Sequence, residues 1–352
     1  MTGNEQGMKF LRELLAEWHL GRAMSKFKAD DYERALSHID CLLKLRDDIR
    51  LYAYKAMALA RLNRSEDAIE ALNECCKRFP TDASTLVLIA RACVELGMLE
   101  RAKSLCEEAL KLSPNNMVAK SLLILTMLES GETKEALTML RDVHLSDDPL
   151  IMARILVALE DYFMSQPRRA PSYKDEIKEA LSKPYPSFKS YHKFINWMIV
   201  AFNMWRAMRM LSRQKLTEAI KTLIKLLHLK PDDFNIRFML GMLLLDAKMP
   251  ELASSLLRDK DEQNTDYHLL KSAIHIHLGE LEEAKKELEL SDKTLSLTHY
   301  CIGLYELRSQ RRDKAVAAFS KAYELDPSLV RERILEVARS IEKALVEQAM
   351  GG

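Results

Sequence analysis

The sequence predicts an all-α protein in which antiparallel helix pairs stack into a solenoid. Ten glycines and ten prolines in 352 residues are too few for a fold of many short strands and tight turns. Apolar residues recur at spacings of three and four along nearly the whole chain, which is typical of amphipathic helices. An alanine also recurs with a period close to 34 residues. One helix pair cannot bury its apolar face alone, so repeated pairs must stack.

The repeated alanine marks the start of the second helix in each pair. It stands at Ala35, Ala68, Ala102, Ala136, Ala219, Ala253, Ala284 and Ala315. A turn-forming residue lies five positions before it in five units: Asp30, Asn63, Gly97, Gly131 and Gly279. A proline lies twelve positions after it in four units: Pro80, Pro114, Pro231 and Pro327. Proline ends the second helix because it has no backbone N–H to donate.

The order of the units predicts four segments. Residues 1–150 form an N-terminal array of about four pairs, and residues 200–329 form a second array of similar size. The distance of 83 residues between Ala136 and Ala219 predicts a degenerate pair with an insertion over 151–199. Its helices are expected at 150–164 and 173–182, and a longer helix at 187–212. Residues 330–352 are expected to form a capping helix and tail, since an array must cover its last apolar face.

The period, the small residue at position 8, Gly or Asn at 15, Ala at 20 and Pro at 32 resemble the tetratricopeptide repeat. The small residues at position 8 are Ala56, Ala90, Ala207, Gly241 and Gly303. The consensus Trp at position 4 and Tyr at 11 are mostly replaced, for example by Leu86 and Cys93, and the units at Ala253 and Ala284 are shortened. The resemblance implies a right-handed superhelix whose first helices line a concave groove.

The groove implied by this resemblance is apolar and rich in methionine. Its residues would be Val87, Arg91, Val94, Ser121, Leu125, Leu128, Met204, Met208, Leu211, Phe238, Met242, Leu245, Tyr300, Leu304 and Leu307. Such a surface suits a helical or extended apolar segment of a protein partner. The clamp of Lys, Asn and Arg with which similar domains hold chaperone C-termini is missing. Two alternatives stay open: the groove is covered by the protein itself, through curvature or the 151–190 insert, or the chain self-associates.

The middle of the chain is basic and aromatic, with no Asp or Glu from residue 180 to 217. Candidate anion-binding residues are Lys189, Lys193, Arg206, Arg209 and Arg213. Segment 183–215 therefore supports an alternative function, as a nucleic-acid-binding or peripheral-membrane adaptor. We expect instead that its aromatic rings pack a joint between the two arrays, and we expect neither nucleic acid nor a membrane as partner.

The sequence contains no pattern of catalytic, metal-binding or cofactor-binding residues. His268, His275, His277 and His299 have no cysteine or paired carboxylate at ligand spacing, and the six cysteines form no C-x-x-C pair. The net charge is +1, and no signal peptide or apolar run of about 20 residues is present. We expect a cytoplasmic, non-catalytic interaction scaffold or adaptor that uses no cofactor.

Overall fold

The computed structural model describes residues 3–79, 82–141, 144–165, 173–182, 203–204, 206–207, 210 and 215–350. These residues contain eighteen α-helices, one short 3-10 helix (η1, Asp259–Asp261) and no strand, so the all-α prediction is confirmed. The chain divides into two compact units. Unit 1 comprises residues 1–158 and 338–352, and unit 2 comprises residues 159–337. The division at residues 150, 199 and 329 expected from the sequence stays a prediction.

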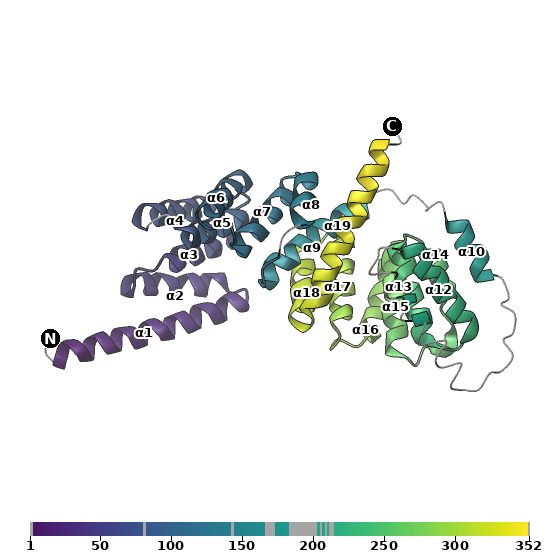
Figure 1. Cartoon of the computed structure of the whole chain (residues 1–352). Helices are drawn as coiled ribbons and strands as arrows, with labels where there is room; N and C mark the ends of the chain where they lie inside the picture. Colours follow the sequence, from purple (N-terminus) through teal and green to yellow (C-terminus); the bar gives the residue numbers. More distant parts are fainter. Residues whose placement is uncertain are drawn as a thin grey trace. The chain divides into compact units, whose positions relative to one another are not determined.

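Unit 1 is built from helix pairs that pack one upon the next (Figure 1). Its complete helices are α1 (Gly3–Lys28), α2 (Tyr32–Leu45), α3 (Ile49–Arg61), α4 (Ser65–Arg78), α5 (Ala83–Glu95), α6 (Leu99–Leu112), α7 (Met117–Glu129) and α8 (Thr133–Arg141). Helix α9 (Pro149–Ser165) starts in this unit. The first helices α3, α5 and α7 contact one another in sequence while each packs against its own second helix. This contact pattern is that of a solenoid.

Unit 2 repeats the same arrangement. Its helices are α10 (Lys174–Ser182), α12 (Leu216–Leu229), α13 (Phe234–Asp246), α14 (Pro250–Ser254), α15 (Thr265–Leu278), α16 (Leu281–Leu290), α17 (Ser296–Arg308) and α18 (Arg312–Leu325), followed by the start of α19 (Pro327–Met350). First helices α13, α15 and α17 contact one another in order. Helix α10 packs on α12, and His228 on α12 lies 3.1 Å from the backbone oxygen of Ala180.

The repeat register explains the packing inside both units. All eight repeated alanines are completely buried, because a larger side chain there would hold the paired helices apart. The small residues at position 8 are buried as well. A Cβ atom at Gly303 would lie 2.4 Å from the ring of Phe319, so only glycine allows α18 to approach α17 this closely. The sequence prediction of small residues at each helix crossing is confirmed.

The turns between paired helices use left-handed backbone. Asp30, Asn63, Gly97, Gly131 and Gly279 all have positive φ, as the turn positions predict. Lys248 and Gln310 also have φ near 58°, and each stands five residues before a repeated alanine. Lys and Gln are not typical of this conformation, so residue type alone does not predict these two turns. Their position five residues before the repeated alanine does.

Capping residues begin many of the first helices. The carboxylate of Asp82 accepts a hydrogen bond of 2.7 Å from the backbone N–H of Thr85, and Asp48, Asn116, Asp233 and Asn264 cap α3, α7, α13 and α15 in the same way. Each cap satisfies an N–H group that the first turn leaves without an intrahelical partner. Helix starts are therefore encoded locally.

Helices α9 and α10 lie where the two helices of the degenerate pair are expected, and their pairing stays a prediction. Of the longer helix expected at 187–212, only residues 203, 204, 206, 207 and 210 are described, and these are helical. Pro80 and the prolines at 167, 171, 184 and 186 lie outside the described residues. The final helix is longer than expected and begins at Pro327. Its apolar stripe is buried at Val330, Ile334, Val337 and Ile341, which confirms that it is amphipathic.

Candidate functional site

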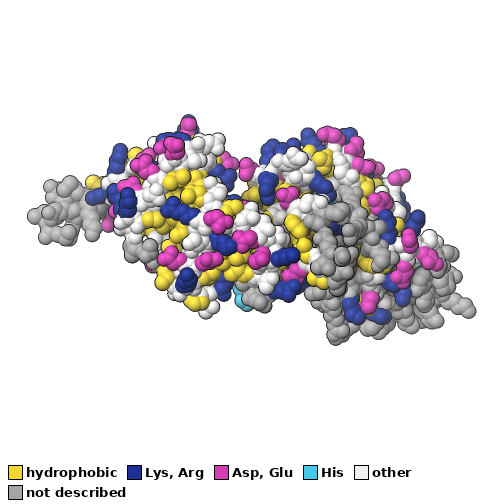
Figure 2. All heavy atoms as spheres, turned by 90° about the horizontal axis from the view of Figure 1, so that it is seen from above, with side chains coloured by type: hydrophobic (Ala, Val, Ile, Leu, Met, Phe, Trp, Pro, Cys, Tyr) yellow, Lys and Arg dark blue, Asp and Glu magenta, His cyan; other side chains and the backbone are white. Residues whose placement is uncertain are grey.

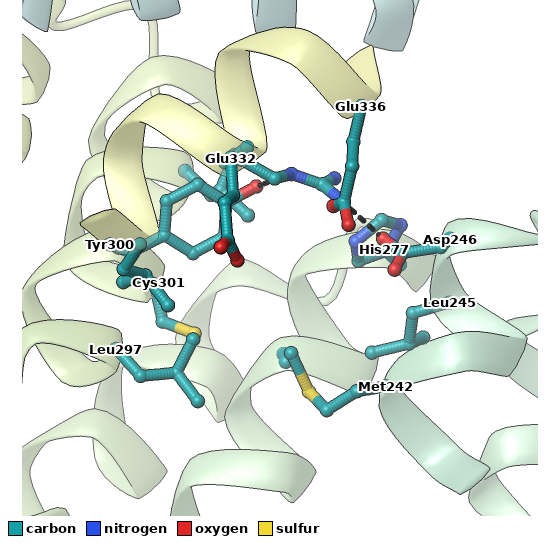
Figure 3. A pocket seen from close by; sticks show the side chains of 13 residues that line it. Met242, Leu245, Asp246, His277, Leu297, Tyr300, Cys301, Glu332 and Glu336 are labelled. Carbon is teal, nitrogen blue, oxygen red and sulfur yellow. Dashed lines mark hydrogen bonds and ion pairs between the residues drawn. The ribbon is translucent and has the colours of Figure 1, made fainter. Parts of the chain in front are cut away.

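A pocket of about 170 Å³ opens among the first helices of unit 2 (Figure 3). It is lined by Met242, Leu245 and Asp246 of α13, Ala273 and His277 of α15, Leu297, Tyr300, Cys301 and Leu304 of α17, and Leu329, Glu332, Arg333 and Glu336 of α19. Four of these, Met242, Leu245, Tyr300 and Leu304, belong to the groove expected from the sequence. We call this site the unit-2 pocket.

Helix α19 contributes one wall of the unit-2 pocket. From the sequence, this helix is expected to cover the end of the array, and the groove is expected to be covered, if at all, by curvature or by the 151–190 insert. Leu245, Tyr300 and Leu304 are buried, and Met242 is half-buried. The start of α19 therefore occupies part of the surface that the first helices α13, α15 and α17 would otherwise present.

A buried ionic cluster attaches α19 to the groove. The Nε–H of Arg333 lies 2.9 Å from Glu160 Oε1 and 2.7 Å from the hydroxyl oxygen of Tyr300. Its Nη1 lies 2.6 Å from Asp246 Oδ1. The Tyr300 hydroxyl donates a 2.5 Å hydrogen bond to Glu160. Four elements, α9, α13, α17 and α19, thus meet at one guanidinium group.

The electrostatics of this cluster are mutually reinforcing. Burial opposes the charge on Arg333, but Asp246, Tyr300 and Glu160 outweigh it and raise the pKa of the guanidinium well above its usual value. Burial also raises the pKa of Tyr300 well above its usual range. Arg333 therefore stays charged and Tyr300 stays protonated, so both remain fixed hydrogen-bonding groups at physiological pH.

The mouth of the unit-2 pocket is acidic. The carboxylates of Glu332 and Glu336 extend from α19 toward the cavity, and Glu336 lies beside Asp246 and His277 (Figure 3). Met242, Leu245 and Leu297 face them from the opposite side. Three carboxylates lie around the cavity, and two of them, Asp246 and Glu336, lie 2.6 and 3.5 Å from the guanidinium of Arg333. The pocket therefore combines an apolar floor with a rim on which negative charge is in excess.

The groove residues expected in unit 1 are mostly buried. Val87, Val94, Ser121 and Leu125 have little or no exposed surface, while Leu128 is half-buried. Segment 144–148 covers part of this face: the backbone N–H of Ser146 donates to Ser121 Oγ at 2.9 Å, and Arg91 pairs with Asp148 at 2.7 Å.

Helix α9 also makes contacts on this side of unit 1. Arg154 forms ion pairs with Glu95 at 2.9 Å and with Glu129 at 2.8 Å. These ion pairs connect α9 to α5 and α7, the first helices of the two preceding helix pairs. They stabilise the stack, and they also occupy polar groups that a partner would otherwise contact.

The remaining expected groove residues are placed as follows. Met204 and Phe238 are half-buried, and Leu307 is buried. Met208 and Leu211 lie outside the described residues. The groove as one continuous binding surface therefore stays a prediction, and the unit-2 pocket is where its members meet in an accessible cavity.

The basic middle segment lies almost wholly outside the described residues. Of the five candidate anion-binding residues, only Arg206 is described, and its side chain is exposed. Lys189, Lys193, Arg209 and Arg213 lie outside, as does Trp205. No helix in the described part of the chain is both long and apolar enough to cross a bilayer. The alternative function of this segment stays a prediction.

The surface and the thiols are chemically unremarkable. On the face shown in Figure 2, basic and acidic side chains alternate over the described residues.

Burial raises the pKa of Cys93 to about 11 and that of Cys106 and Cys301 to about 12, so these thiols stay protonated. His268 and His275 lie 2.7 and 2.6 Å from Glu287 and Glu280. Within the described residues no group of three His, Cys, Asp or Glu side chains is placed to hold a metal ion.

The ionic cluster of the unit-2 pocket is not among the features expected from the sequence. Glu160, Asp246 and Arg333 occupy no groove position of the repeat, so the register does not single them out. A signal was nevertheless present, because Glu160 interrupts the apolar run of α9 and Arg333 follows Val330 and precedes Ile334 in the stripe of α19. A charged residue inside an apolar face indicates a buried partner.

Residues 25–135 match the family described as "Psidin, N-terminal TPR repeats region". This match shows tetratricopeptide repeats over residues 25–135, and the same repeat register continues through the helix pairs of unit 2. Such repeats generally serve as non-enzymatic protein-interaction scaffolds. No curated protein sequence matches the chain closely enough to indicate a relative.

The chain is also similar to several solved tetratricopeptide-repeat structures. One is a repeat protein from Parabacteroides merdae, with 12% identity, a TM-score of 0.31, and 93% of this chain and 99% of that one covered. Another is the TPR2AB domain of yeast Sti1 in complex with pHSP90, with 14% identity, a TM-score of 0.29, and coverage of 86% and 99%. The human IFIT1 dimer with PPP-AAAA has 17% identity, a TM-score of 0.28, and coverage of 97% and 87%. At these TM-scores none of the three indicates a function for this chain.

Proposed function

We propose that the chain is a non-catalytic scaffold or adaptor that holds an apolar segment of a partner protein at the unit-2 pocket. The observation that carries the proposal is that Met242, Leu245, Tyr300 and Leu304 line one accessible cavity. A volume of about 170 Å³ is close to that of engineered cavities of about 150 Å³ that hold benzene. The pocket therefore has room for one large side chain of the partner, and not for a whole helix.

The rim of the pocket defines the chemistry of that partner. Arg333 pairs with Glu160, Tyr300 and Asp246 and also lies 3.5 Å from Glu336. Glu332 and Glu336 are nevertheless exposed and line the mouth of the pocket. A partner segment that places one apolar anchor in the cavity and a lysine or arginine next to it would satisfy both surfaces. We infer an amphipathic, basic segment, in helical or extended form.

The location proposed for this scaffold is the cytoplasm. All six cysteines are free, which is usual for proteins of reducing compartments. A cytosolic scaffold with a basic-peptide preference would bind segments of other cytosolic chains.

Selection from a displayed library of random twelve-residue peptides, with the full chain as bait, tests the proposal. We expect enrichment of peptides in which Leu, Met or Phe stands near Lys or Arg. The double variant Glu332→Lys/Glu336→Lys should lose these peptides and favour acidic ones, since charge complementarity sets specificity. Glu289→Lys on the exposed face of α16 is the matched control and should select the same peptides as the unaltered chain. A selection that is identical for all three proteins would refute the assignment.

A further inference from the structure

Helix α1 is apolar on two opposite faces, and only one of them is covered. Ala16, Leu20, Ala23 and Phe27 pack into the core of unit 1 with Ile39 and Leu42. At about 100° per residue these four side chains of α1 fall within about 60° of azimuth. A helix that only ends an array needs no more than this one buried stripe.

The second apolar face of α1 is exposed. Its residues and their exposed fractions are Phe10 64%, Leu11 62%, Leu14 59%, Leu15 46% and Trp18 51%. They span about 140° of azimuth on the side opposite the buried stripe. They are also five of the eleven large apolar side chains that are exposed among the described residues. We call this set the α1 stripe.

The α1 stripe extends beyond the neighbouring helix. Helix α1 has 26 residues and α2 has 14, which corresponds to lengths of about 39 and 21 Å. The guanidinium of Arg12 reaches the backbone oxygen of Lys44 at the end of α2. Phe10 and Leu11 precede Arg12 in the chain, and Figure 1 shows that the start of α1 extends beyond α2. Because the stripe lies opposite the face of α1 that packs on α2, a second helix could lie along it without displacing α2.

We propose that the α1 stripe is a self-association surface, on which the α1 helices of two copies of this chain pair in parallel. The stripe has the spacing of a short coiled coil, with Leu11, Leu14 and Trp18 at the seam. Phe10 and Leu15 flank the seam on opposite edges, so that the Phe10 of one copy meets the Leu15 of the other.

Charge on the two edges selects the parallel orientation and a second copy. Glu17 lies on one edge of the stripe and Arg22 on the other, five residues apart, and both are exposed. Within one copy Glu17 lies 3.6 Å from Arg46 and Arg22 lies over the Trp18 ring, and such exposed contacts are weak enough to be exchanged on pairing. In a parallel pair, residues five apart on opposite edges face each other across the seam, so two Glu17–Arg22 ion pairs form. An antiparallel pair would bring like edges together and lose both. The edges carry both signs of charge, which does not favour adsorption on an anionic membrane.

The exposed area is adequate for this role. The five side chains expose on the order of 500 Å² of apolar surface, against about 800 Å² per partner in a stable interface of standard size. The flanking charged residues and the backbone of α1 would supply most of the remainder. The net charge of +1 also leaves little overall repulsion between copies.

Sedimentation or light scattering of the full chain over a range of concentrations tests the proposal. We expect a mass of twice 40.5 kDa at high concentration. Phe10→Glu and Leu14→Glu should each raise the dissociation constant by about tenfold or more, with circular dichroism and the melting temperature unchanged because both residues are exposed. Leu112→Glu, at a side chain of α6 that is 57% exposed, is the matched control and should leave the dimer intact.

A charge reversal tests the orientation. Glu17→Arg should weaken the dimer, and Glu17→Arg/Arg22→Glu should restore it. A chain that is monomeric at every concentration, or a dimer that neither Phe10→Glu nor Leu14→Glu weakens, overturns the proposal. Failure of the double reversal to restore the dimer overturns the parallel arrangement, and a monomer that binds anionic vesicles through α1 would assign the stripe to a lipid surface instead.

Discussion

Gln310 departs from the repeat consensus at a position where the departure costs conformational energy. It holds a left-handed turn with φ of 59° that glycine occupies in three other units. An L residue in this conformation is strained by about 1–2 kcal/mol. Its side chain is exposed, so the strain is not repaid by packing.

Gln310→Gly should therefore stabilise the protein by about 1 kcal/mol, after the greater chain entropy of glycine in the unfolded state is subtracted. Chemical denaturation of both proteins measures the difference. The converse change, Gly279→Ala, has free space around the new Cβ but a φ of 87°, and it should destabilise by about 1–2 kcal/mol. A neutral or destabilising Gln310→Gly would mean that the turn is not strained.

Gly303 is the opposite kind of position, where space and not φ requires glycine. A methyl group there would overlap the Phe319 ring, and we expect Gly303→Ala to destabilise by about 1–3 kcal/mol through overpacking. Gly21→Ala provides the control, because nothing lies within 4 Å of the added atom and alanine is the better helix former. That variant should gain up to about 1 kcal/mol. Equal effects of the two changes in thermal denaturation would contradict the packing explanation.

At the scale of elements, α19 has a larger role than that of a cap. Arg333 links α19 to α9, α13 and α17. Helix α19 therefore connects helices that are not all adjacent in the repeat stack. The cluster is costly to break because Glu160 is almost completely buried and would lose its charged partner.

Arg333→Met should accordingly destabilise unit 2 by about 3–5 kcal/mol. Adding Glu160→Gln should recover part of this loss, since the buried carboxylate is then neutral. A double-mutant cycle from denaturation curves measures the coupling between the two residues. If the two changes are simply additive, Arg333 and Glu160 do not act as a pair, and α19 is held by its apolar stripe alone.

At the scale of the whole molecule, the last residues of the chain belong to the first compact unit. Ala338 and Ile341 are buried, and Arg141 on α8 pairs with Glu342 at 2.8 Å, all within unit 1. The C-terminal part of α19 thus completes a core that is otherwise made from residues 1–158.

Ile341→Ala should cost about 2–5 kcal/mol, the usual range for a buried isoleucine, and the loss should fall on unit 1. Amide hydrogen exchange is the appropriate measurement: protection should decrease in α7 and α8 while α15 and α17 keep theirs. Glu342→Ala removes only a half-exposed ion pair and should cost less than about 1 kcal/mol. A loss of protection confined to unit 2 would contradict this division of the chain.

Local chemistry in the sequence was enough to predict the helix pairs, the buried alanines, most of the turns and the amphipathic stripe of α19. Each of these features repeats with a short period, because a helix crossing or a turn makes the same steric demand in every unit. For the same reason the register identified Met242, Leu245, Tyr300 and Leu304 as residues of one face.

Only the tertiary structure decided which part of that face is open. The path of α19, the ion pairs of Arg333 and the cover that segment 144–148 places on Ser121 join residues 25 to 173 positions apart. Such contacts occur once and have no period, so no repeat in the sequence signals them. They depend on where the stack brings its distant elements together, and that placement is a property of the folded chain.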